Sequence, residues 1–349
     1  MAVQFCCISG RQAGIVSVVR FDDVAETADI VSQCAVGAKP LPLIRGLAGR
    51  QLLVAAGADP VQLVTLELDE QGALTVVDTV PCPFAPTSMA LSPDHRLVAA
   101  VCYHESRLAV AAIDGSARID PNSWVVRPTG RQPHCIVFSP DGRFAYRSEL
   151  GEDRLVGHEV SGGELVTDDA LGVGFPSGAG PRHIVVDRAG SNAYVIEELG
   201  GHVVHLRRDV GDGRLTRADE IVYHEPSEGL RHGVYVPPQR PPVEDEQRAR
   251  IWGADLALDP AGRWLVASER RASTLTLQAL EPDGSFGARL DHVRTETQPR
   301  AIGLVGDHHV VAGAEKGRTV SFYRVGEKLS LVAQLSGLGG PSWFQTLPA

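Results

Sequence analysis

The feature that most constrains the fold is a repeat of roughly 45 residues that runs through the chain. Each copy opens with Pro or Trp and continues with an apolar strand, usually a polar turn containing Pro or Gly, a second apolar strand, a polar break and a third strand. The clearest copies are Pro86–Ile113, Pro133–Val160, Pro181–Leu206, Trp252–Leu280 and Pro299–Val325. Repeats of this length, each with several short strands, are typical of β-propeller blades.

The opening residue of each copy counts the blades. It falls at seven places: Pro42, Pro86, Pro133, Pro181, Trp252, Pro299 and Pro341. We therefore predict an all-β, seven-bladed propeller with four-stranded antiparallel blades.

The last blade is divided between the two ends of the sequence. Only one strand, Ser342–Leu347, follows Pro341, and Ala2–Asp22 contains two further strands, Phe5–Ile8 and Ile15–Phe21. We expect these terminal strands to share one blade, because that arrangement closes the ring and leaves no free inner edge.

One step of the repeat, from Pro181 to Trp252, is too long and contains an insertion, Glu225–Arg250. Its Pro and charge content predicts an extended loop and not a further blade. We therefore expect a single propeller domain over residues 1–349. Leu230–Tyr235 could form a lid over the channel, but we favour a surface loop.

Composition and charge limit the cellular compartments and the partners that we expect for the protein. No apolar run is long enough to span a membrane, and the N-terminus lacks the pattern of a signal peptide. The six cysteines form no CxxC motif, so we expect buried, reduced thiols and a cytoplasmic protein. The net charge of −10 argues against nucleic-acid partners. A closed ring is compatible with a monomer or a weak homo-oligomer.

The repeat also predicts where a functional site lies. In a blade hairpin, the start of the first strand lies beside the end of the second, so these positions from every blade gather on one rim of the central channel. First-strand starts supply His134, Arg182 with His183, Trp252 with Asp255, and Gln298 with Arg300. Second-strand ends supply Tyr103 with His104, Glu149, Glu197 with Glu198, Glu269 with Arg270, and Glu315 with Lys316.

This rim concentrates arginine, histidine and carboxylate side chains. Arginine binds carboxylate and phosphate oxygens well, and a histidine or carboxylate among the arginines can act as a base. The same charges could instead only pair with one another and solvate the loop ends. The chain has no GxSxG elbow, no GxxxxGK phosphate loop and no histidine with an acidic partner at metal-ligand spacing, so we expect no metal and no cofactor.

Several segments resemble a known family, the seven-bladed propeller type of 6-phosphogluconolactonase, which also includes the fungal carboxy-muconate lactonizing enzyme and sugar-acid lactonases. The resemblance is continuous from about residue 80 to the end and weaker over the first two blades. The segments that carry it are Gly180-Pro-Arg-His-Ile-Val, Ala193-Tyr through Glu198-Leu, Trp252-Gly-Ala-Asp-Leu, Asp259-Pro-Ala-Gly-Arg, Glu269-Arg-Arg-Ala-Ser, Thr295-Glu-Thr-Gln-Pro-Arg and Gly340-Pro-Ser-Trp343.

The resemblance implies a lactonase whose active-site set is His134, Arg182, Glu198 and Arg270. We expect the substrate-binding residues to be Tyr103, His183, Trp252, Asp255, Gln298 and Arg300. The chain departs from the family pattern in the sequence Arg147-Ser-Glu149 after His134 and in the long Glu225–Arg250 loop.

The expected reaction is hydrolysis of 6-phosphogluconolactone to 6-phosphogluconate without a metal. Arg182 and Arg270 would hold the anionic substrate and stabilise the oxyanion, and Glu198 or His134 would activate water. A phosphate would favour a further arginine, for which Arg147, Arg231, Arg271 and Arg300 are candidates. Two alternatives stay open: a lactonase or lactonizing enzyme for an unphosphorylated acid, such as an aldarolactone or carboxy-muconate, and a non-catalytic propeller scaffold.

Overall fold

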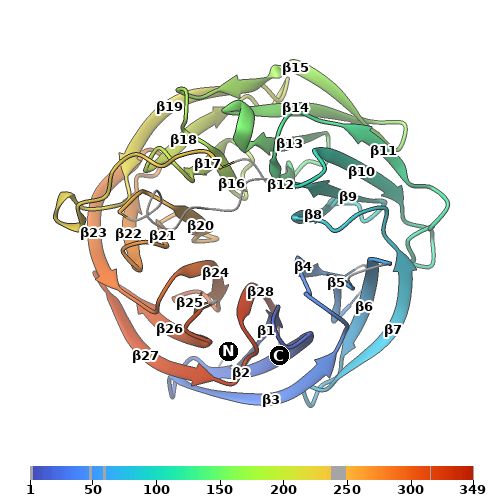
Figure 1. Cartoon of the computed structure of the whole chain (residues 1–349), viewed down its shortest axis with the longest axis horizontal. Helices are drawn as coiled ribbons and strands as arrows, with labels where there is room; N and C mark the ends of the chain where they lie inside the picture. The colour runs from blue at the N-terminus through green and yellow to red at the C-terminus, as the bar shows by residue number, and fades with distance from the viewer. Residues whose placement is uncertain (1–2, 47–48, 58–59, 237–248, 315, 349) are drawn as a thin grey trace.

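The structure, a computed structural model, describes residues 3–46, 49–57, 60–236, 249–314 and 316–348. Within these residues, seven four-stranded antiparallel sheets surround a central channel, as Figure 1 shows. The innermost strands of neighbouring blades contact one another around the ring. The predicted fold class and number of blades are therefore confirmed.

The strands follow one another from the channel outwards in six of the blades. Their bounds in the first three of these blades are β4 Leu43–Arg45, β5 Gln51–Ala56, β6 Gln62–Leu68 and β7 Leu74–Pro81; β8 Ser88–Leu91, β9 Leu97–Cys102, β10 Arg107–Ala112 and β11 Val125–Pro128; and β12 Pro133–Phe138, β13 Phe144–Glu149, β14 Arg154–Ser161 and β15 Glu164–Gly174. In the next three they are β16 Pro181–Val186, β17 Asn192–Glu197, β18 His202–Arg208 and β19 Leu215–Val222; β20 Gly253–Leu258, β21 Trp264–Glu269, β22 Thr274–Leu280 and β23 Phe286–Arg294; and β24 Pro299–Val305, β25 His309–Ala314, β26 Thr319–Val325 and β27 Leu329–Ser336.

The seventh blade joins the two ends of the chain. Its inner strand is the last one, β28 (Pro341–Pro348), which pairs with β1 (Val3–Gly10). The sheet continues through β2 (Ile15–Asp22) to β3 (Thr27–Ala35) on the outside. The predicted sharing of one blade by the terminal strands is confirmed.

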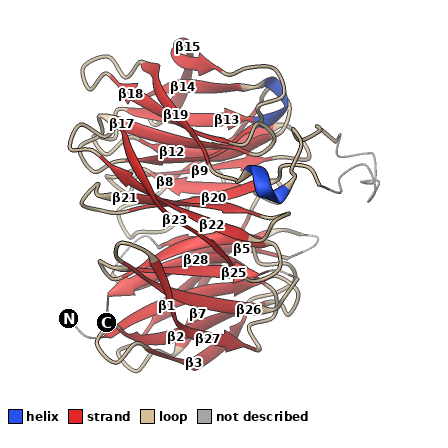
Figure 2. Cartoon of the chain, turned by 90° about the vertical axis from the view of Figure 1, so that its left-hand side faces the viewer, coloured by secondary structure: helices blue, strands red, loops and turns tan. Residues whose placement is uncertain are grey.

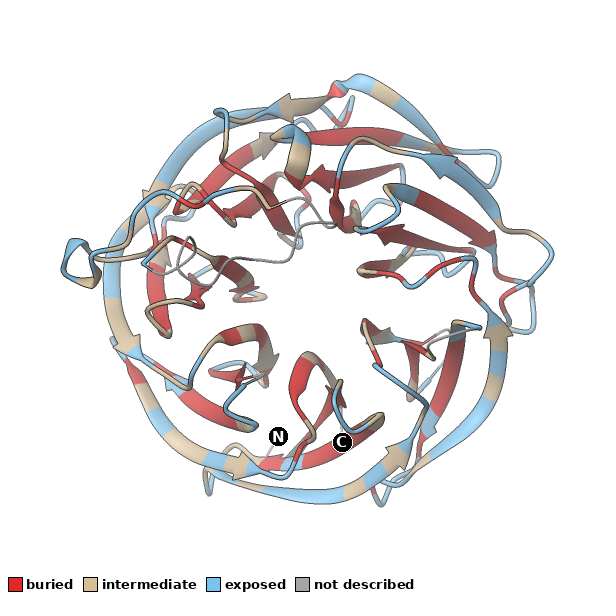
Figure 3. Ribbon diagram, in the orientation of Figure 1, coloured by how far each residue is buried: buried red, intermediate tan, exposed pale blue. Residues whose placement is uncertain are grey.

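Burial follows the layers of each blade, as Figure 3 shows. Second strands are the most deeply buried, and every residue of β9, β13, β17 and β21 is buried. Outer strands such as β3 and β19 are mostly exposed. This pattern explains why the second strands have apolar sequences without strict alternation, since both of their faces pack against neighbouring blades.

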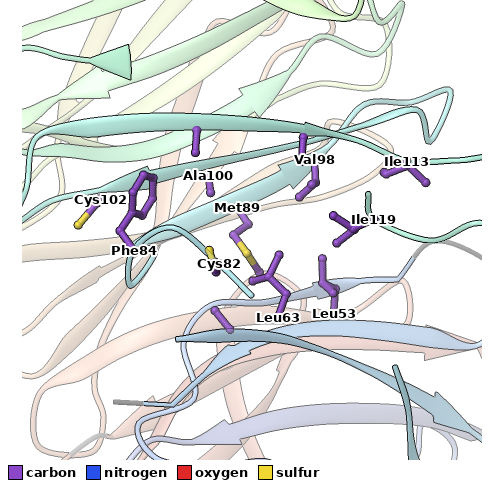
Figure 4. Packing of buried hydrophobic residues seen from close by; sticks show 13 residues of the cluster. Leu53, Leu63, Cys82, Phe84, Met89, Val98, Ala100, Cys102, Ile113 and Ile119 are labelled. Carbon is purple, nitrogen blue, oxygen red and sulfur yellow. The ribbon is translucent and has the colours of Figure 1, made fainter. Parts of the chain in front are cut away.

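Apolar side chains fill the space between adjacent blades. Figure 4 shows one such cluster, in which Leu53 and Leu63 of one blade pack with Met89, Val98 and Ala100 of the next. Cys82 and Cys102 lie in the same cluster. All six cysteines are free, and all but Cys34 are buried, in line with the predicted buried thiols.

The long insertion contains no strand in its described part. It has a 3-10 turn, η2 (Pro226–Glu228), and a single bridge between Arg231 and Arg250, and positions 237–248 lie outside the described residues. Figure 2 shows η2 on the same side of the ring as the only other such turn described, η1 (Leu150–Glu152).

The described part of the insertion contacts the rim. The Gly233 N–H donates to the carbonyl of Leu199 (2.8 Å), next to Glu198. The Arg131 guanidinium lies 5.7 Å from the centre of the Tyr235 ring. These contacts place the described part of the insertion beside the rim. Among the residues described, no helix is long and apolar enough to cross a membrane.

Candidate active site

A repeated backbone hydrogen bond places side chains at the rim. In each case, the residue after a second strand donates its N–H to the carbonyl of the residue before the first strand. The pairs are Leu150 with Gln132 (3.1 Å), Glu198 with Gly180 (2.7 Å), Arg270 with Trp252 (3.1 Å) and Arg11 with Gly340 (3.0 Å). Because the bond recurs in four blades, these four residues occupy equivalent positions at the mouth of the channel.

A cavity of about 430 Å³ opens at this rim, a size suited to a small-molecule ligand. It is lined by seven of the ten expected active-site and substrate-binding residues: Tyr103, His134, Arg182, Glu198, Trp252, Arg270 and Arg300. Other lining residues include Arg11, Lys39, Thr87 and His104. The predicted active-site set, His134, Arg182, Glu198 and Arg270, therefore shares one cavity.

Glu198 connects two arginines from neighbouring blades. Nε of Arg182 and Nη2 of Arg270 both donate to Oε2 of Glu198, each at 2.8 Å. The Arg182 and Arg270 side chains are only 2% and 5% exposed, and that of Glu198 is 14% exposed. These are buried, charge-assisted bonds, which are stronger than exposed ion pairs.

Backbone carbonyls of β20 and the residue before it hold the same arginines. Arg182 donates through Nη1 to the carbonyl of Ala254, and Arg270 donates through Nη2 to that of Gly253 (2.7 Å) and through Nε to that of Trp252 (3.1 Å). The Arg270 guanidinium also lies 3.8 Å from the centre of a Trp252 ring. Both guanidinium groups are therefore fixed in orientation before a substrate binds.

The charges of this cluster are set by burial and by one another. Burial would raise the pKa of Glu198, but Arg270 and Arg182 outweigh it and hold the pKa below its ordinary value. Burial lowers the pKa of Arg270 to about 9, despite the opposing effect of Glu198. At neutral pH the carboxylate is therefore ionised and Arg270 is protonated.

His134 lies against the cluster as a neutral imidazole. Burial, followed by the charge of Arg182, lowers the pKa of His134 well below its ordinary value. Its Nδ1 is buried and makes no hydrogen bond to any described residue. The His134 ring centre lies 5.0 Å from that of His183 and 5.9 Å from that of Tyr103.

His183 and Asp255 lie further along the inner strands and line a second cavity of about 190 Å³. Nδ1 of His183 donates to Oδ1 of Asp255 at 2.5 Å, and the Ile302 N–H donates to Oδ2 (2.9 Å). Burial lowers the pKa of His183 even though Asp255 opposes the shift. These two expected substrate-binding residues therefore form a buried pair beside the larger cavity and do not line it.

Gln298, another expected binding residue, lines neither cavity. Its backbone has a positive φ of 61°, and its N–H donates to Oγ of Ser273 (3.2 Å). Gln132 has a φ of 56° and donates to Oγ of Ser106 in the same way (3.4 Å). The residue before the opening proline thus has a recurring structural role in these two blades.

Three of the four arginines considered for a phosphate lie away from the larger cavity or are engaged elsewhere. Arg147 donates to Glu149 (2.6 Å) and His158 (2.9 Å) inside its blade. The Arg231 backbone pairs with Ala249 and Ile251, and the Arg271 guanidinium lies 4.7 Å from a Trp252 ring centre. Only Arg300 of the four lines the cavity.

The carboxylates at the second-strand ends point into the blades and not into the channel. Glu149 accepts hydrogen bonds from the Gly130 N–H (2.7 Å), Arg147 (2.6 Å) and Arg154 (2.7 Å). Glu269 accepts from the Trp252 N–H (2.7 Å), and Glu197 contacts Nδ1 of His202 (3.0 Å). The sequence named both residues of each pair, Glu197 with Glu198 and Glu269 with Arg270, and in each pair only the second residue lines the cavity. Glu315 lies outside the described residues, and Lys316 does not line the cavity.

Two lining cations, Arg11 and Lys39, were missed from the sequence. Arg11 follows β1, the second strand of the divided blade, so the rule used for the other blades would have found it. Lys39 lies in the connection from β3 to β4, where the Gly57 N–H donates to the carbonyl of Ala38 (2.7 Å). Gly57 is the residue after the second strand, β5, and has no side chain. The cation at this place comes instead from Lys39 in the adjacent connection.

Comparisons with known proteins agree with this architecture. Residues 3–344 match the family model described as "Lactonase, 7-bladed beta-propeller". The match includes the first two blades, where the resemblance seen in the sequence alone was weaker.

Two relatives named 6-phosphogluconolactonase illustrate the similarity. The protein from Sodalis glossinidius (strain morsitans) is 27% identical over 82% of each chain. The protein from Pectobacterium carotovorum subsp. carotovorum (strain PC1) is 26% identical over 88% of this chain and 87% of the relative.

Solved structures share the fold. The Pseudomonas aeruginosa structure titled a periplasmic gluconolactonase, PpgL, is 19% identical with a TM-score of 0.81 over 99% of each chain. A protein from Lactobacillus plantarum is 20% identical with a TM-score of 0.82, over 99% of this chain and 100% of that one. The chain is thus an enzyme of the seven-bladed β-propeller lactonase family.

Proposed function

We propose that the protein hydrolyses 6-phosphogluconolactone to 6-phosphogluconate. The observation that carries the proposal is the charge of the cavity: its described lining has five cationic side chains, at Arg11, Lys39, Arg182, Arg270 and Arg300, and one carboxylate, Glu198. Such an excess of cations suits a substrate with a dianionic phosphate. The relatives named 6-phosphogluconolactonase support the same substrate.

In this proposal, the two arginines held by Glu198 polarise the lactone carbonyl. Their hydrogen bonds to described residues engage neither Nη2 of Arg182 nor Nη1 of Arg270. These N–H groups can donate to the carbonyl oxygen, which becomes negatively charged as water attacks. Donors that are already oriented stabilise this oxyanion without further reorganisation.

His134 activates the water. Its neutral imidazole takes a proton from the water as the oxygen attacks the carbonyl carbon, forming a tetrahedral intermediate. The intermediate collapses, the bond from the carbonyl carbon to the ring oxygen breaks, and the imidazolium returns the proton to that oxygen. The product acid then releases one proton, which leaves a carboxylate and a hydroxyl group.

Glu198 has a different role in this scheme. Its Oε2 already accepts two charge-assisted hydrogen bonds, and its pKa is below the ordinary value. Because the two arginines already occupy this oxygen, the carboxylate is poorly placed to accept a proton from water. We infer that Glu198 orients the arginines and compensates their charge while His134 is the base.

The test is turnover of freshly generated 6-phosphogluconolactone, with gluconolactone and glucarolactone alongside. Arg182→Ala is the site variant, and Arg96→Ala, at an exposed position outside the cavity, is the matched control. Fast loss of the phosphorylated lactone that is abolished only in Arg182→Ala supports the proposal. Turnover of the unphosphorylated lactones alone would contradict the substrate, and turnover of none would contradict the reaction.

We also propose that the protein functions in the cytoplasm. The support is its six free cysteines, since thiols persist in a reducing compartment. Fractionation of the source cells with an antibody to the protein tests this, and recovery in a periplasmic fraction would contradict it.

A further inference from the structure

The cations of the cavity form an arc. Arg182 comes from the blade of β16–β19, Arg270 from that of β20–β23, Arg300 from that of β24–β27, and Arg11 from the divided blade. Lys39 lies in the connection that leads from the divided blade into that of β4–β7. Four consecutive blades, and the connection into the next blade, therefore each place one cation at the cavity. The other two blades and the connection into the first of them supply no arginine or lysine to its described lining, but Ala85, Pro86, Thr87, Tyr103, His104 and His134.

The two ends of this arc differ in their surroundings. At one end, Arg182 and Arg270 share Glu198, so their charge is partly compensated. Arg11 and Lys39 lie on the other side of the ring (Figure 1). Between the divided blade and the blade of Arg182 there are two blades in one direction around the ring and three in the other. No carboxylate other than Glu198 lines the cavity within the described residues.

The backbone fixes Arg11 at this rim. Its N–H donates to the carbonyl of Gly340 (3.0 Å), and the next N–H, of Gln12, donates to that of Gly339 (2.8 Å). Arg11 thus stands in its blade where Arg270 and Glu198 stand in theirs. Lys39 is exposed and is close to the Ala38–Gly57 backbone bond that joins its connection to the end of β5.

We propose that Arg11 and Lys39 form the phosphate-binding end of the cavity, opposite the Arg182–Glu198–Arg270 cluster. This inference rests on the proposed function and specifies it. The lactone carbonyl lies at the Glu198 cluster, and the phosphoryl group lies at Arg11 and Lys39, with Arg300 between the two ends. Discrimination between phosphorylated and unphosphorylated lactones then depends on two residues that are remote from the reacting carbonyl.

The experiment compares two substrates in one double variant, Arg11→Gln with Lys39→Gln. Each lost cation removes a charge-assisted interaction with phosphate, so kcat/KM for 6-phosphogluconolactone should fall by roughly 100-fold or more. The change for unphosphorylated gluconolactone should stay within about threefold, because the oxyanion-binding cluster is intact. The matched control is Arg96→Gln with Lys328→Gln, which removes the same charges from exposed positions outside the cavity and should change neither value. Circular dichroism confirms that each variant folds.

An equal loss for both lactones, or no loss for either, would overturn the inference. If the unmodified protein turns over neither lactone, the proposed function fails and calorimetric titration with 6-phosphogluconate and gluconate tests the inference by itself. Tighter binding of 6-phosphogluconate that disappears in the double variant would support the phosphate end. Equal binding of the two acids would reject it.

Discussion

Arg182 and Arg270 lie on neighbouring blades but donate to the same oxygen atom, Oε2 of Glu198. Neither arginine is held by its own blade alone. Arg182 also donates to the Ala254 carbonyl of the next blade. Arg270 donates to the Trp252 and Gly253 carbonyls of its own blade and to Glu198 of the preceding one. The relative position of the two guanidinium groups therefore depends on a carboxylate that belongs to the first blade and on backbone that belongs to the second.

Replacing Glu198 should disturb catalysis more than folding. In Glu198→Gln, the amide is a weaker acceptor for the two guanidinium groups, so both arginines lose their fixed orientation. We expect kcat to fall by roughly 100- to 1,000-fold, comparable to the loss of an oriented oxyanion donor. Steady-state kinetics with a thermal melt on the same sample measures both effects. Near-normal kcat in a folded variant would reject the positioning role.

The pH dependence, measured together with a His134→Asn variant, should test His134 as the base. The pKa of His134 is well below its ordinary value of about 6.5, so the imidazole stays neutral as the pH falls through that value. Activity should therefore persist below pH 6.5 and decline only when the imidazole becomes protonated. The profile of kcat/KM, corrected for spontaneous hydrolysis, tests this. A decline centred near pH 6.5 would contradict it, and so would an unchanged profile in His134→Asn.

Glu149 should stabilise the fold in a pH-dependent way. Burial would raise its pKa, but Arg147 and the hydrogen bonds lower it overall. A carboxylate whose pKa is lowered by folding contributes stability above its unfolded pKa of about 4.3, and that stability is lost as the pH falls through the folded pKa. Glu149→Gln leaves Arg147 buried without a charged partner, so at neutral pH we expect a loss of about 3–5 kcal/mol in the free energy of unfolding.

Urea unfolding at several pH values measures this contribution. The matched control is Glu164→Gln, which removes an exposed pair with Arg127 and should cost less than about 1 kcal/mol. Equal costs for the two variants would mean that burial of the Glu149 network adds nothing.

Asp255 should stabilise the fold through hydrogen bonds that join neighbouring blades. Asp255→Ala removes the acceptor for the Ile302 N–H, which belongs to the next blade, and for Nδ1 of His183. Each buried donor left unsatisfied costs about 1–3 kcal/mol. Asp255→Asn keeps an acceptor for the Ile302 N–H and should cost less. Chemical denaturation of both variants tests this order, and the reverse order would contradict it.

Removal of divalent cations should leave turnover unchanged, because in the proposed mechanism the arginines polarise the lactone carbonyl. Among the residues described, no three His, Cys, Asp or Glu side chains gather to hold a metal ion. The measurement is kcat before and after dialysis against EDTA. A loss that added Mg²⁺ or Ca²⁺ restores would overturn this expectation.

The opening prolines made much of the architecture predictable from the sequence. They begin or closely precede the inner strands, so the period alone indicated the number of blades and the divided blade. They also located His134, Arg182 and Arg300, each of which directly follows its proline and lines the cavity.

Side-chain direction at the second-strand ends was harder to predict. Glu197 and Glu198 are identical in type and adjacent, yet one points into the blade and the other into the cavity. The choice depends on the hydrogen bond between the residue after the strand and the carbonyl before the inner strand, which composition does not reveal. The His183–Asp255 pair joins residues 72 positions apart on neighbouring blades, so it too required the three-dimensional arrangement.

The divided blade makes the order of synthesis relevant to catalysis. Arg11 leaves the ribosome long before Gly340, whose carbonyl fixes it, and β28 is made later still. Until that strand pairs with β1, the ring is an open chain of blades with one incomplete sheet. Arg11, one of the five cations of the arc, is then not yet held in position. A nascent or truncated chain would then hold most of its blades without a finished binding cavity, so that lactone turnover reports on ring closure.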